Sequence, residues 1–371
     1  GKEGAELEKQ LVEKLNGYGM RCVGPNCLGV VNTDPEVRMD GCFAESLPER
    51  GNIGFVSQSG ALGGGILNIL KDLNLGFAQF ISIGNQADVN AETALEYWEN
   101  EKDVEQILLY MESIQNPANF RKLATRISKK KPILALKAGR SAAGASAASS
   151  HTGSLAGADK AANALLAQSG VIREYSLKNL FSTAKVFANC PIPKGNRVAI
   201  ITNSGGPGIM ATDAICEYGM EIAKITDETK EKLRSFLPAA ASVKNPIDMI
   251  ASAPIEHYKE TLKTVIADEN VDMIMVIYLP FLGLKDIDVA KAVMEIKAQH
   301  PEKPVIGVFM TKSEFFSALS DMDVNMPFFM YAEEAAEGFM RLDQQRKWIE
   351  RPEGKIPCYD VDRERAEKIM Y

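Results

Sequence analysis

Short apolar runs alternate with segments of helical spacing along most of the chain, which predicts an α/β fold. In the first half, the runs that predict strands occupy residues 53–56, 77–81, 107–110 and 132–136. Segments whose apolar residues recur with helical spacing follow them, at residues 60–72, 91–100, 117–129 and 155–168. Continuous apolar strands separated by helices are typical of a parallel sheet covered on both faces. We therefore expect a doubly wound parallel sheet in this part of the chain.

The same alternation starts again near Arg197, after a Pro-rich linker at residues 191–195. Strands are predicted at residues 198–202, 273–277 and 305–309. Helices are predicted at residues 208–218, 226–236, 257–267, 285–299 and 331–346. Both units begin with a strand, a Gly-rich turn that contains serine, and a helix, which indicates an internal duplication. If the two units pack pseudo-symmetrically, we expect their first helix N-termini to face each other.

Both ends of the chain carry isolated elements. Residues 4–18 have the leucine spacing of a helix, and residues 21–23 predict a strand. One helix and one strand cannot bury a core alone, so we expect them to be the last βα repeat of a domain whose earlier strands are absent. Residues 350–371 predict a linker and the start of another helix. We therefore expect this sequence to be a piece of a longer protein.

The two Gly-rich turns are candidate phosphate sites. Glycines let the backbone approach an anion, and the free N–H groups of a helix's first turn point at it. Neither turn ends in the Lys-Ser/Thr pair of a P-loop, and each alone is also explained as a tight strand-to-helix turn. Together they predict one phosphate site between two helix N-termini. The predicted phosphate-binding residues are Ser59, Gly60, Ala61, Ser204, Gly205, Gly206 and Gly208.

His151 is the main candidate for covalent chemistry. It follows a loop of Gly, Ala and Ser at residues 139–149 and precedes a predicted helix. An exposed imidazole on a flexible arm can accept a phosphoryl group at neutral pH. The alternative is a surface histidine that caps a helix. The other two histidines, His257 and His300, lie on predicted helices, where we expect surface residues without a catalytic role.

Composition and charge exclude several classes of protein. The chain has 371 residues, of which 46% are apolar, and a net charge of −7 with acids and bases interspersed. Nucleic-acid binding needs a basic face, so we expect no nucleic-acid partner. No apolar run approaches the length of a membrane span, and we expect no signal peptide. Six scattered cysteines without a Cys-x-x-Cys pair favour reduced thiols and a cytoplasmic protein, with no metal site.

Five motifs occur in one order along nearly the whole chain. They are Gly24-Pro25-Asn26-Cys27, Ser57-Gln58-Ser59-Gly60, Met111-Glu112-Ser113, Ser150-His151-Thr152-Gly153-Ser154 and Asn245-Pro246-Ile247-Asp248. This order resembles the nucleoside-diphosphate-forming acyl-CoA synthetases, the superfamily of succinyl-CoA synthetase and ADP-forming acetyl-CoA synthetase. The resemblance implies two flavodoxin-like doubly wound parallel-sheet domains, at 49–190 and 191–348. It also implies a remnant of a Rossmann-like CoA-binding domain at 1–48, and a linker at 349–371 towards an ATP-grasp module that this sequence does not contain.

The resemblance implies the following chemistry. Acyl-CoA and phosphate exchange to acyl phosphate and CoA, His151 takes the phosphoryl group, and phosphohistidine passes it to ADP. Glu112 orients the imidazole. ATP or ADP with Mg²⁺ is bound by an ATP-grasp module or subunit, which makes that module a partner and an oligomer the expected state. Asn26 and Cys27 lie beside the CoA thiol, although a buried small residue after a tight turn remains an equal reading of Cys27.

Two further motifs receive weaker assignments. Asn85 and Gln86 are candidates for contact with phosphate or the acyl group, but a polar strand-end loop explains them equally well. Asn245 and Asp248 are expected to be structural residues at the domain junction, because Asx-Pro turns commonly are.

Two other classes of function remain open. One is the CoA-binding regulatory region of a fused protein acetyltransferase without synthetase turnover, and the other is a pure assembly module. The presence of both His151 and Glu112 favours the synthetase. The acyl group and the choice between ADP and GDP are not readable from the sequence. We expect this polypeptide alone to make no acyl-CoA.

Overall fold

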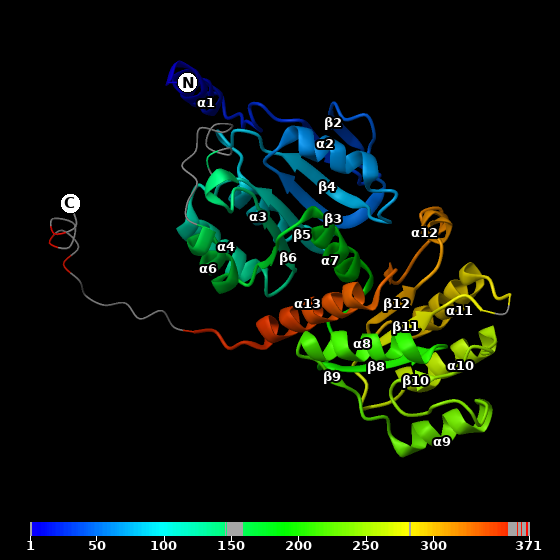
Figure 1. The fold of residues 1–371 in the computed structure, drawn as a ribbon. Coiled ribbons are helices and arrows are strands. Elements are labelled where there is room, and N and C mark those ends of the chain that lie inside the picture. Colours follow the sequence, from blue (N-terminus) through cyan, green and yellow to red (C-terminus); the bar gives the residue numbers. More distant parts are fainter. Residues whose placement is uncertain are drawn as a thin grey trace.

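The computed structural model describes residues 2–144, 146, 159–281 and 283–354, together with residues 362, 365 and 369. His151, the predicted helix start at 155–158 and Cys358 therefore lie outside the described residues. The described chain forms two α/β units, which meet along one long helix (Figure 1). None of the described helices is both long and apolar enough to cross a membrane.

The first unit is built on a seven-stranded sheet in the order β2-β1-β4-β3-β5-β6-β7. The strands are β1 (Gly29–Asn32), β2 (Met39–Cys42), β3 (Arg50–Ser57), β4 (Phe77–Ser82), β5 (Gln106–Met111), β6 (Ile133–Lys137) and β7 (Ile172–Glu174). The helices are α1 (Lys2–Gly17), α2 (Gly60–Ile69), α3 (Ala91–Trp98), α4 (Pro117–Ile127), α6 (Asp159–Gln168) and α7 (Leu177–Asn189). The five strands from β4 to β7 are parallel, whereas β1 pairs antiparallel to both β4 and β2.

Apolar residues on both faces of this sheet form its two cores. On one face, α2 and α7 cover a cluster that includes Phe55, Phe77 and Phe181. On the other, α3, α4 and α6 cover a cluster that includes Trp98 and Phe120. The expected sheet covered by helices on both faces is therefore confirmed.

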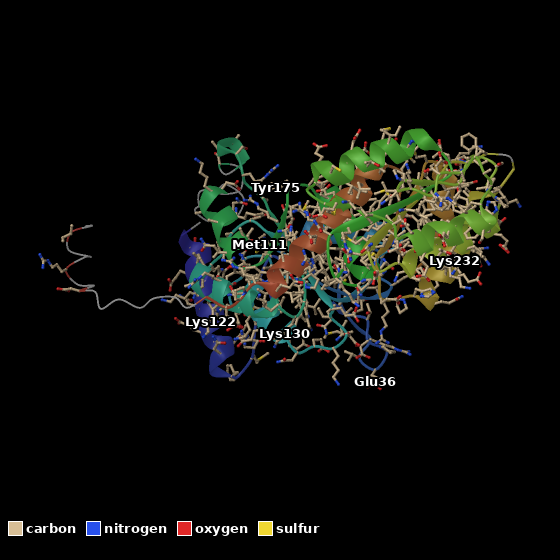
Figure 2. All side chains as sticks on the ribbon, turned by 90° about the horizontal axis from the view of Figure 1, so that it is seen from below. Glu36, Met111, Lys122, Lys130, Tyr175 and Lys232 are labelled. Carbon is tan, nitrogen blue, oxygen red and sulfur yellow. The ribbon has the colours of Figure 1, made fainter. Side chains whose placement is uncertain are left out.

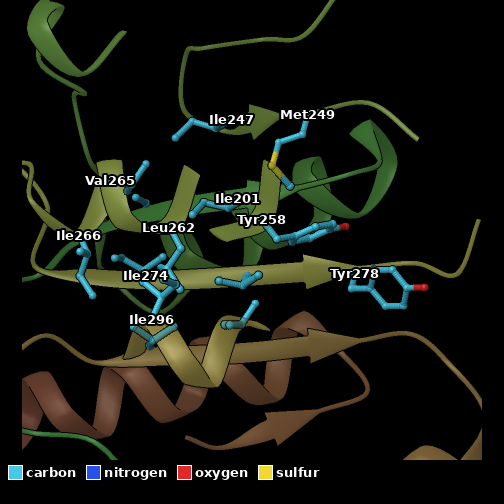
Figure 3. Packing of buried hydrophobic residues seen from close by; sticks show 14 of the residues in the cluster. Ile201, Ile247, Met249, Tyr258, Leu262, Val265, Ile266, Ile274, Tyr278 and Ile296 are labelled. Carbon is cyan, nitrogen blue, oxygen red and sulfur yellow. The ribbon is translucent and has the colours of Figure 1, made fainter. Parts of the chain in front are cut away.

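The second unit has a parallel sheet in the order β10-β8-β11-β12-β13, with β9 paired to β8. Its strands are β8 (Arg197–Thr202), β9 (Glu221–Ile222), β10 (Ile247–Asp248), β11 (Met273–Tyr278), β12 (Val305–Phe309) and β13 (Phe328–Phe329). Its helices are α8 (Gly205–Glu217), α9 (Asp227–Phe236), α10 (Ile255–Ile266), α11 (Asp286–Gln299), α12 (Ser313–Leu319) and α13 (Ala332–Glu350). Figure 3 shows the core beneath α10 and α11, where Leu262, Val265 and Ile296 pack on Ile274 of β11.

Helix α13 joins the two units, because it packs on α8 within its own unit and on α7 of the first. Across this contact, Arg341 of α13 pairs with the buried Glu174 of β7, Nε to Oε1 at 2.9 Å. Burial raises the pKa of Glu174, and the guanidinium of Arg341 opposes that rise. Further along α13, the Trp348 indole donates to Ser128 Oγ at 2.8 Å. The units are therefore held by buried polar contacts as well as by apolar packing.

The N-terminal segment differs from its prediction. Residues 21–23 are not a strand of either sheet. They run beside the loop after β4, where the N–H of Val89 donates to Cys22 O at 3.0 Å and the N–H of Ala87 donates to Gly24 O at 3.1 Å. Arg21 makes a bidentate ion pair with Asp88, Nε to Oδ2 at 2.8 Å and Nη2 to Oδ1 at 2.8 Å. Helix α1 stands off the body of the unit (Figure 1), and its Leu7 is 60% exposed.

The outer surface carries charges of both signs. Lys122 projects from α4 of the first unit and Lys130 from the turn just after it, whereas Lys232 projects from α9 at the other end of the molecule (Figure 2). Lys130 forms one of two ion pairs to Glu99, at 2.9 Å. The described surface therefore shows the interspersed charges expected from the sequence.

Candidate active site

Four loops meet at the carboxyl edge of the first sheet, where open α/β sheets bind their ligands. They follow β3, β4, β5 and β6 in turn, at residues 58–60, 84–86, 112–113 and 138–140. Because the four strands are adjacent and parallel, these loops lie side by side. The strands predicted from the sequence end just before these same loops.

Gln58 connects two of these loops. Its Oε1 accepts the backbone N–H of Glu112 at 2.7 Å and that of Ser113 at 3.1 Å, and its Nε2 donates to Ser113 Oγ at 3.2 Å. Gln86, predicted as a weak substrate contact, instead donates to the same Ser113 Oγ at 3.4 Å and is buried. Gln58 and Ser113 belong to two of the five motifs, but neither was predicted as a site residue. The available signal was an amide side chain directly after a buried strand.

Glu112 lies in the loop directly after β5 and is only 9% exposed. Its Oε2 is buried and has no hydrogen-bond partner among the described residues. Its cationic neighbour is Lys137, since Lys137 at the end of β6 pairs with Met111 at the end of β5. Burial lowers the pKa of Lys137, and the Glu112 carboxylate opposes that effect. A buried carboxylate oxygen without a partner can accept a hydrogen bond from another group.

The segment that contains His151 is anchored at both ends near this edge. Before it, the Arg140 guanidinium lies 5.1 Å from the centroid of the Tyr175 ring. After it, Asp159 forms an ion pair with Arg173, whose guanidinium lies 5.0 Å from the same ring. His151 is eight residues before Asp159, so the chain allows it a reach of about 29 Å at most from that anchor.

The N-terminus of α2 is the first predicted phosphate cradle. Ser59 is its N-cap, and Ser59 Oγ accepts the N–H of Leu62 at 3.3 Å. The N–H groups of Gly60 and Ala61 belong to the first turn, where a helix offers no intrahelical acceptor. A Cβ at Gly60 would come within 3.2 Å of the Leu28 N atom. This helix end therefore lies against the Cys27–Leu28 backbone.

The Gly24-Pro25-Asn26-Cys27 segment is fixed beside the cradle by the loop after β4. Asn85 donates its backbone N–H to Pro25 O at 3.0 Å. The Asn26 side chain donates to Asn85 Oδ1 at 3.3 Å. Asn26 is exposed, and Cys27 is partly buried with its thiol 3.5 Å from Val23 O. Asn85 is therefore bonded to the N-terminal segment.

The second cradle, at the N-terminus of α8, requires one correction. The Ser204 side chain makes no cap hydrogen bond, and Gly205 and Gly206 are exposed. Gly208, predicted as a phosphate donor, instead directs its N–H to Ser204 O at 3.4 Å. A Cβ there would come within 3.2 Å of Thr202 Cγ2, so Gly208 is a packing glycine.

The expectation that the two helix N-termini face each other is wrong for this chain. It is the C-terminal end of α2 that meets the second unit, because Lys71 directly after it pairs with Asp321 after α12 at 2.9 Å. The N-terminus of α2 lies about 15 Å away at the other end of that helix. Figure 1 shows α2 in the first unit and α8 in the second, on the far side of α13.

The remaining sequence candidates lie away from this edge. Asn245 accepts the N–H of Ile200 at 2.9 Å and donates to Val198 O at 2.8 Å, so it stabilises the second sheet and is not at the domain junction. Asp248 lies near the second cradle, because a Cβ at Gly205 would be 3.3 Å from its Oδ2. His257 and His300 are partly exposed and belong to the second unit. Within the described residues no cluster could hold a metal ion.

Comparison with known families agrees with both units. Residues 50–187 match the succinyl-CoA ligase-like flavodoxin domain, and residues 198–351 match the Ligase-CoA domain. The alpha subunit of acetate–CoA ligase [ADP-forming] II from Pyrococcus furiosus is 41% identical over 94% of this chain and 76% of its own length. The 4-hydroxybutyrate–CoA ligase [ADP-forming] of Nitrosopumilus maritimus is 33% identical over 99% of this chain and 53% of its own length.

A solved structure shows the same fold. It is the dinucleotide-forming acetyl-coenzyme A synthetase 1 of Candidatus Korarchaeum cryptofilum in complex with phosphate and ADP. It aligns with a TM-score of 0.85 at 31% identity, over 93% of this chain and 75% of that one.

Proposed function

Because the chain belongs to the ADP-forming acyl-CoA synthetases, we propose that it carries the acyl-CoA and phosphohistidine steps of that reaction at the carboxyl edge of its first sheet. The family is a family of ligases that use coenzyme A and a nucleotide. The relatives compared above are named as ligases, so they do not support the alternative of a CoA-binding regulatory region without synthetase turnover.

The first step exchanges sulfur for oxygen on the acyl carbon. A phosphate oxygen attacks the thioester carbonyl, the carbon–sulfur bond breaks, and CoA leaves as the thiol, giving an acyl phosphate. The free N–H groups of Gly60 and Ala61 at the N-terminus of α2 are suited to hold the phosphate. A helix terminus stabilises a nearby anion by about 0.3–1 kcal/mol when exposed and by up to about 2 kcal/mol when partly buried. The adjacent Asn26 and Cys27 would face the thiol end of CoA.

The second step moves the phosphoryl group to His151. One imidazole nitrogen attacks phosphorus, the bond to the acyl oxygen breaks, and the carboxylate leaves. The other nitrogen keeps its hydrogen and gains positive charge, which a carboxylate acceptor stabilises. We assign this role to Glu112. The observation that supports it is the buried Glu112 Oε2, which has no partner among the described residues and lies near the anchors of the His151 segment.

The third step transfers the phosphoryl group from His151 to ADP. We assign the nucleotide and its Mg²⁺ to an ATP-grasp module, either fused or in a separate subunit. Two relatives are named as alpha subunits, which supports a separate one. Because α2 and α8 do not converge within one chain, a phosphate held by both helix termini would require a second copy, and we propose an oligomer. The five cysteines among the described residues, all of them free, and the net charge of −7 support a cytoplasmic enzyme that does not bind nucleic acid.

The test is phosphate incorporation into the complete enzyme, including the nucleotide-binding module. Incubation with labelled ATP and Mg²⁺ should give a phosphoprotein that is labile to acid and stable to base. His151→Ala should abolish the label, whereas His257→Ala, in the second unit, should retain it. Label that persists in His151→Ala, or that withstands acid, would show that the carrier is a different residue.

A further inference from the structure

A cavity of about 440 Å³ lies between the two units, away from the candidate active site. Its first wall comes from the C-terminal part of α2 and from α7, with Ile66, Ile69 and Phe181. Its second wall comes from the second unit, with Phe316, Phe328 and Met330. The volume falls within the range of about 300–1,000 Å³ that is usual for small-molecule sites. The cavity is therefore large enough and apolar enough for a small organic ligand.

One cation in this wall has no anionic partner. Lys185 of α7 lines the cavity and is partly buried, with its ammonium 5.9 Å from the centroid of the Phe329 ring. Among the described residues, no carboxylate lies within ion-pair distance of Lys185. Lys178, about two turns earlier on the same helix, is different because it pairs with Glu334 at 2.8 Å. Burial lowers the pKa of Lys185, and the Glu334 carboxylate, which forms its ion pair with Lys178, opposes that effect only in part.

We propose that this cavity binds a small monocarboxylic acid with an apolar body, its carboxylate paired with Lys185 and its body held between the apolar walls of the two units. A neutral apolar ligand would leave the ammonium unpaired, which is costly in a poorly hydrated site. A dicarboxylate or a phosphate would bring a second negative charge towards Glu334 on the rim. One carboxylate on an apolar body satisfies both constraints.

This site is separate from the proposed catalytic edge and does not depend on the proposed function. The cavity contacts the C-terminal end of α2, whereas Gly60 begins the same helix about 15 Å away. Since the walls belong to both units, a bound acid stabilises their observed arrangement by linkage. Occupation of the site would therefore raise the melting temperature and restrain movement of one unit against the other.

The experiment measures binding directly in the complete enzyme. Methionine methyl groups are labelled with ¹³C, and the Met330 signal, assigned with Met330→Leu, is followed while octanoate is added. We expect a saturable shift of this signal. Lys185→Met should weaken binding at least tenfold, because a charge-assisted contact is lost while the apolar stem remains. The neutral isostere 1-octanol should likewise bind at least tenfold more weakly than octanoate.

Two control variants make the result decisive. Lys232→Met changes the net charge equally but lies on the exposed α9 (Figure 2), so octanoate affinity should stay within twofold of the parent. Ser182→Phe fills the cavity from α7 and should abolish the shift, with its melting curve verifying that the fold is intact. Equal affinity for octanoate and 1-octanol, or unchanged affinity in Lys185→Met, would overturn the proposal. So would a Met330 signal that responds to mixing with the nucleotide-binding subunit or to self-association but not to octanoate, because a protein surface would then be the occupant.

Discussion

Replacing Gln58 by Met tests whether this residue positions Glu112. Met has nearly the volume of Gln, so packing changes little, but the acceptor for the Glu112 and Ser113 N–H groups is lost. An unsatisfied buried donor costs about 1–3 kcal/mol, so the two together predict a loss of about 2–6 kcal/mol in the free energy of unfolding. The loop after β5 should then shift, and a misplacement of about 1 Å near a reacting group costs roughly 100-fold in rate.

Gln79→Met is the matched control. Gln79 is 7% exposed, as is Gln58, and accepts the Trp98 indole N–H at 2.8 Å within the core of the first unit. Its replacement also leaves a buried donor unsatisfied, which should cost about 1–3 kcal/mol, but it does not touch the Glu112 loop. Chemical denaturation measures the stability of both variants, and the rate of label transfer to His151 measures the chemistry. The positioning argument fails if Gln58→Met labels within threefold of the parent rate, or if Gln79→Met slows as much.

Three further changes test other parts of the structure. Glu112→Gln should slow phosphorylation about 10–100-fold and leave CoA affinity within twofold, because only the charge that stabilises the imidazolium is removed; an unchanged rate would mean that Glu112 is structural. Hydrogen bonds from Arg21 lower the pKa of Asp88 in the folded protein. The pair therefore gives its full stabilisation above the unfolded pKa of about 3.9, and this stabilisation is lost as the pH falls through the lower pKa of the folded state. Asp88→Asn should thus raise hydrogen exchange at residues 20–28 at pH 7, and no increase would refute the anchor. Gly170→Ala should lower the melting temperature, because its φ is +71° and a Cβ would lie 2.0 Å from Trp348 Cε2; an unchanged melting temperature would show that the contact between the units gives way easily.

The sequence predicted the long elements well because they carry a clear hydrophobic period. The runs at 53–56 and 273–277 lie within β3 and β11, and the predicted helices overlap those observed. The two-residue strands β9, β10 and β13 are too short to show any period. Strand β7 was missed for another reason, since Arg173 and Glu174 made it look exposed. Both side chains are buried because each finds an ion-pair partner outside the strand, Arg173 in Asp159 and Glu174 in the distant Arg341, which the pattern within the strand does not reveal.

The site was predicted at the level of its loops but not of its contacts. Motif order located Glu112 and the N-terminus of α2 on the same edge, and the strand pattern explains why. The bonds that fix this edge connect residues far apart in the sequence, such as Gln58 with Glu112, 54 positions apart, and Arg21 with Asp88, 67 positions apart. The prediction that the N-termini of α2 and α8 face each other was wrong for a related reason. Internal duplication indicates that two units share a fold, but it does not determine which ends of them meet.

The same strand-to-helix turn occurs after β3 in the first unit and after β8 in the second. The units differ in the residue that this turn contacts after the neighbouring strand. In the first, Ser57 Oγ donates to Ser59 O at 2.7 Å and Gln58 bonds the loop after β5. In the second, Thr202 Oγ1 donates to Ser204 O at 2.8 Å, and Asn203 bonds both backbone groups of Leu279 after β11.

The register of the strands shows which residues of the two units occupy equivalent positions. Ser57 pairs with Tyr110 and Thr202 with Ile277, so Leu279 occupies in the second unit the place that Glu112 occupies in the first. By the same register, Phe309 stands where the first unit has Lys137. The second edge thus keeps the turn and the free helix N-terminus but has Leu279 at the position of the acid and Phe309 at the position of the cation. The role proposed for Glu112 therefore has no counterpart at Leu279, because the repeated backbone fixes the position but not the side chain that stands there.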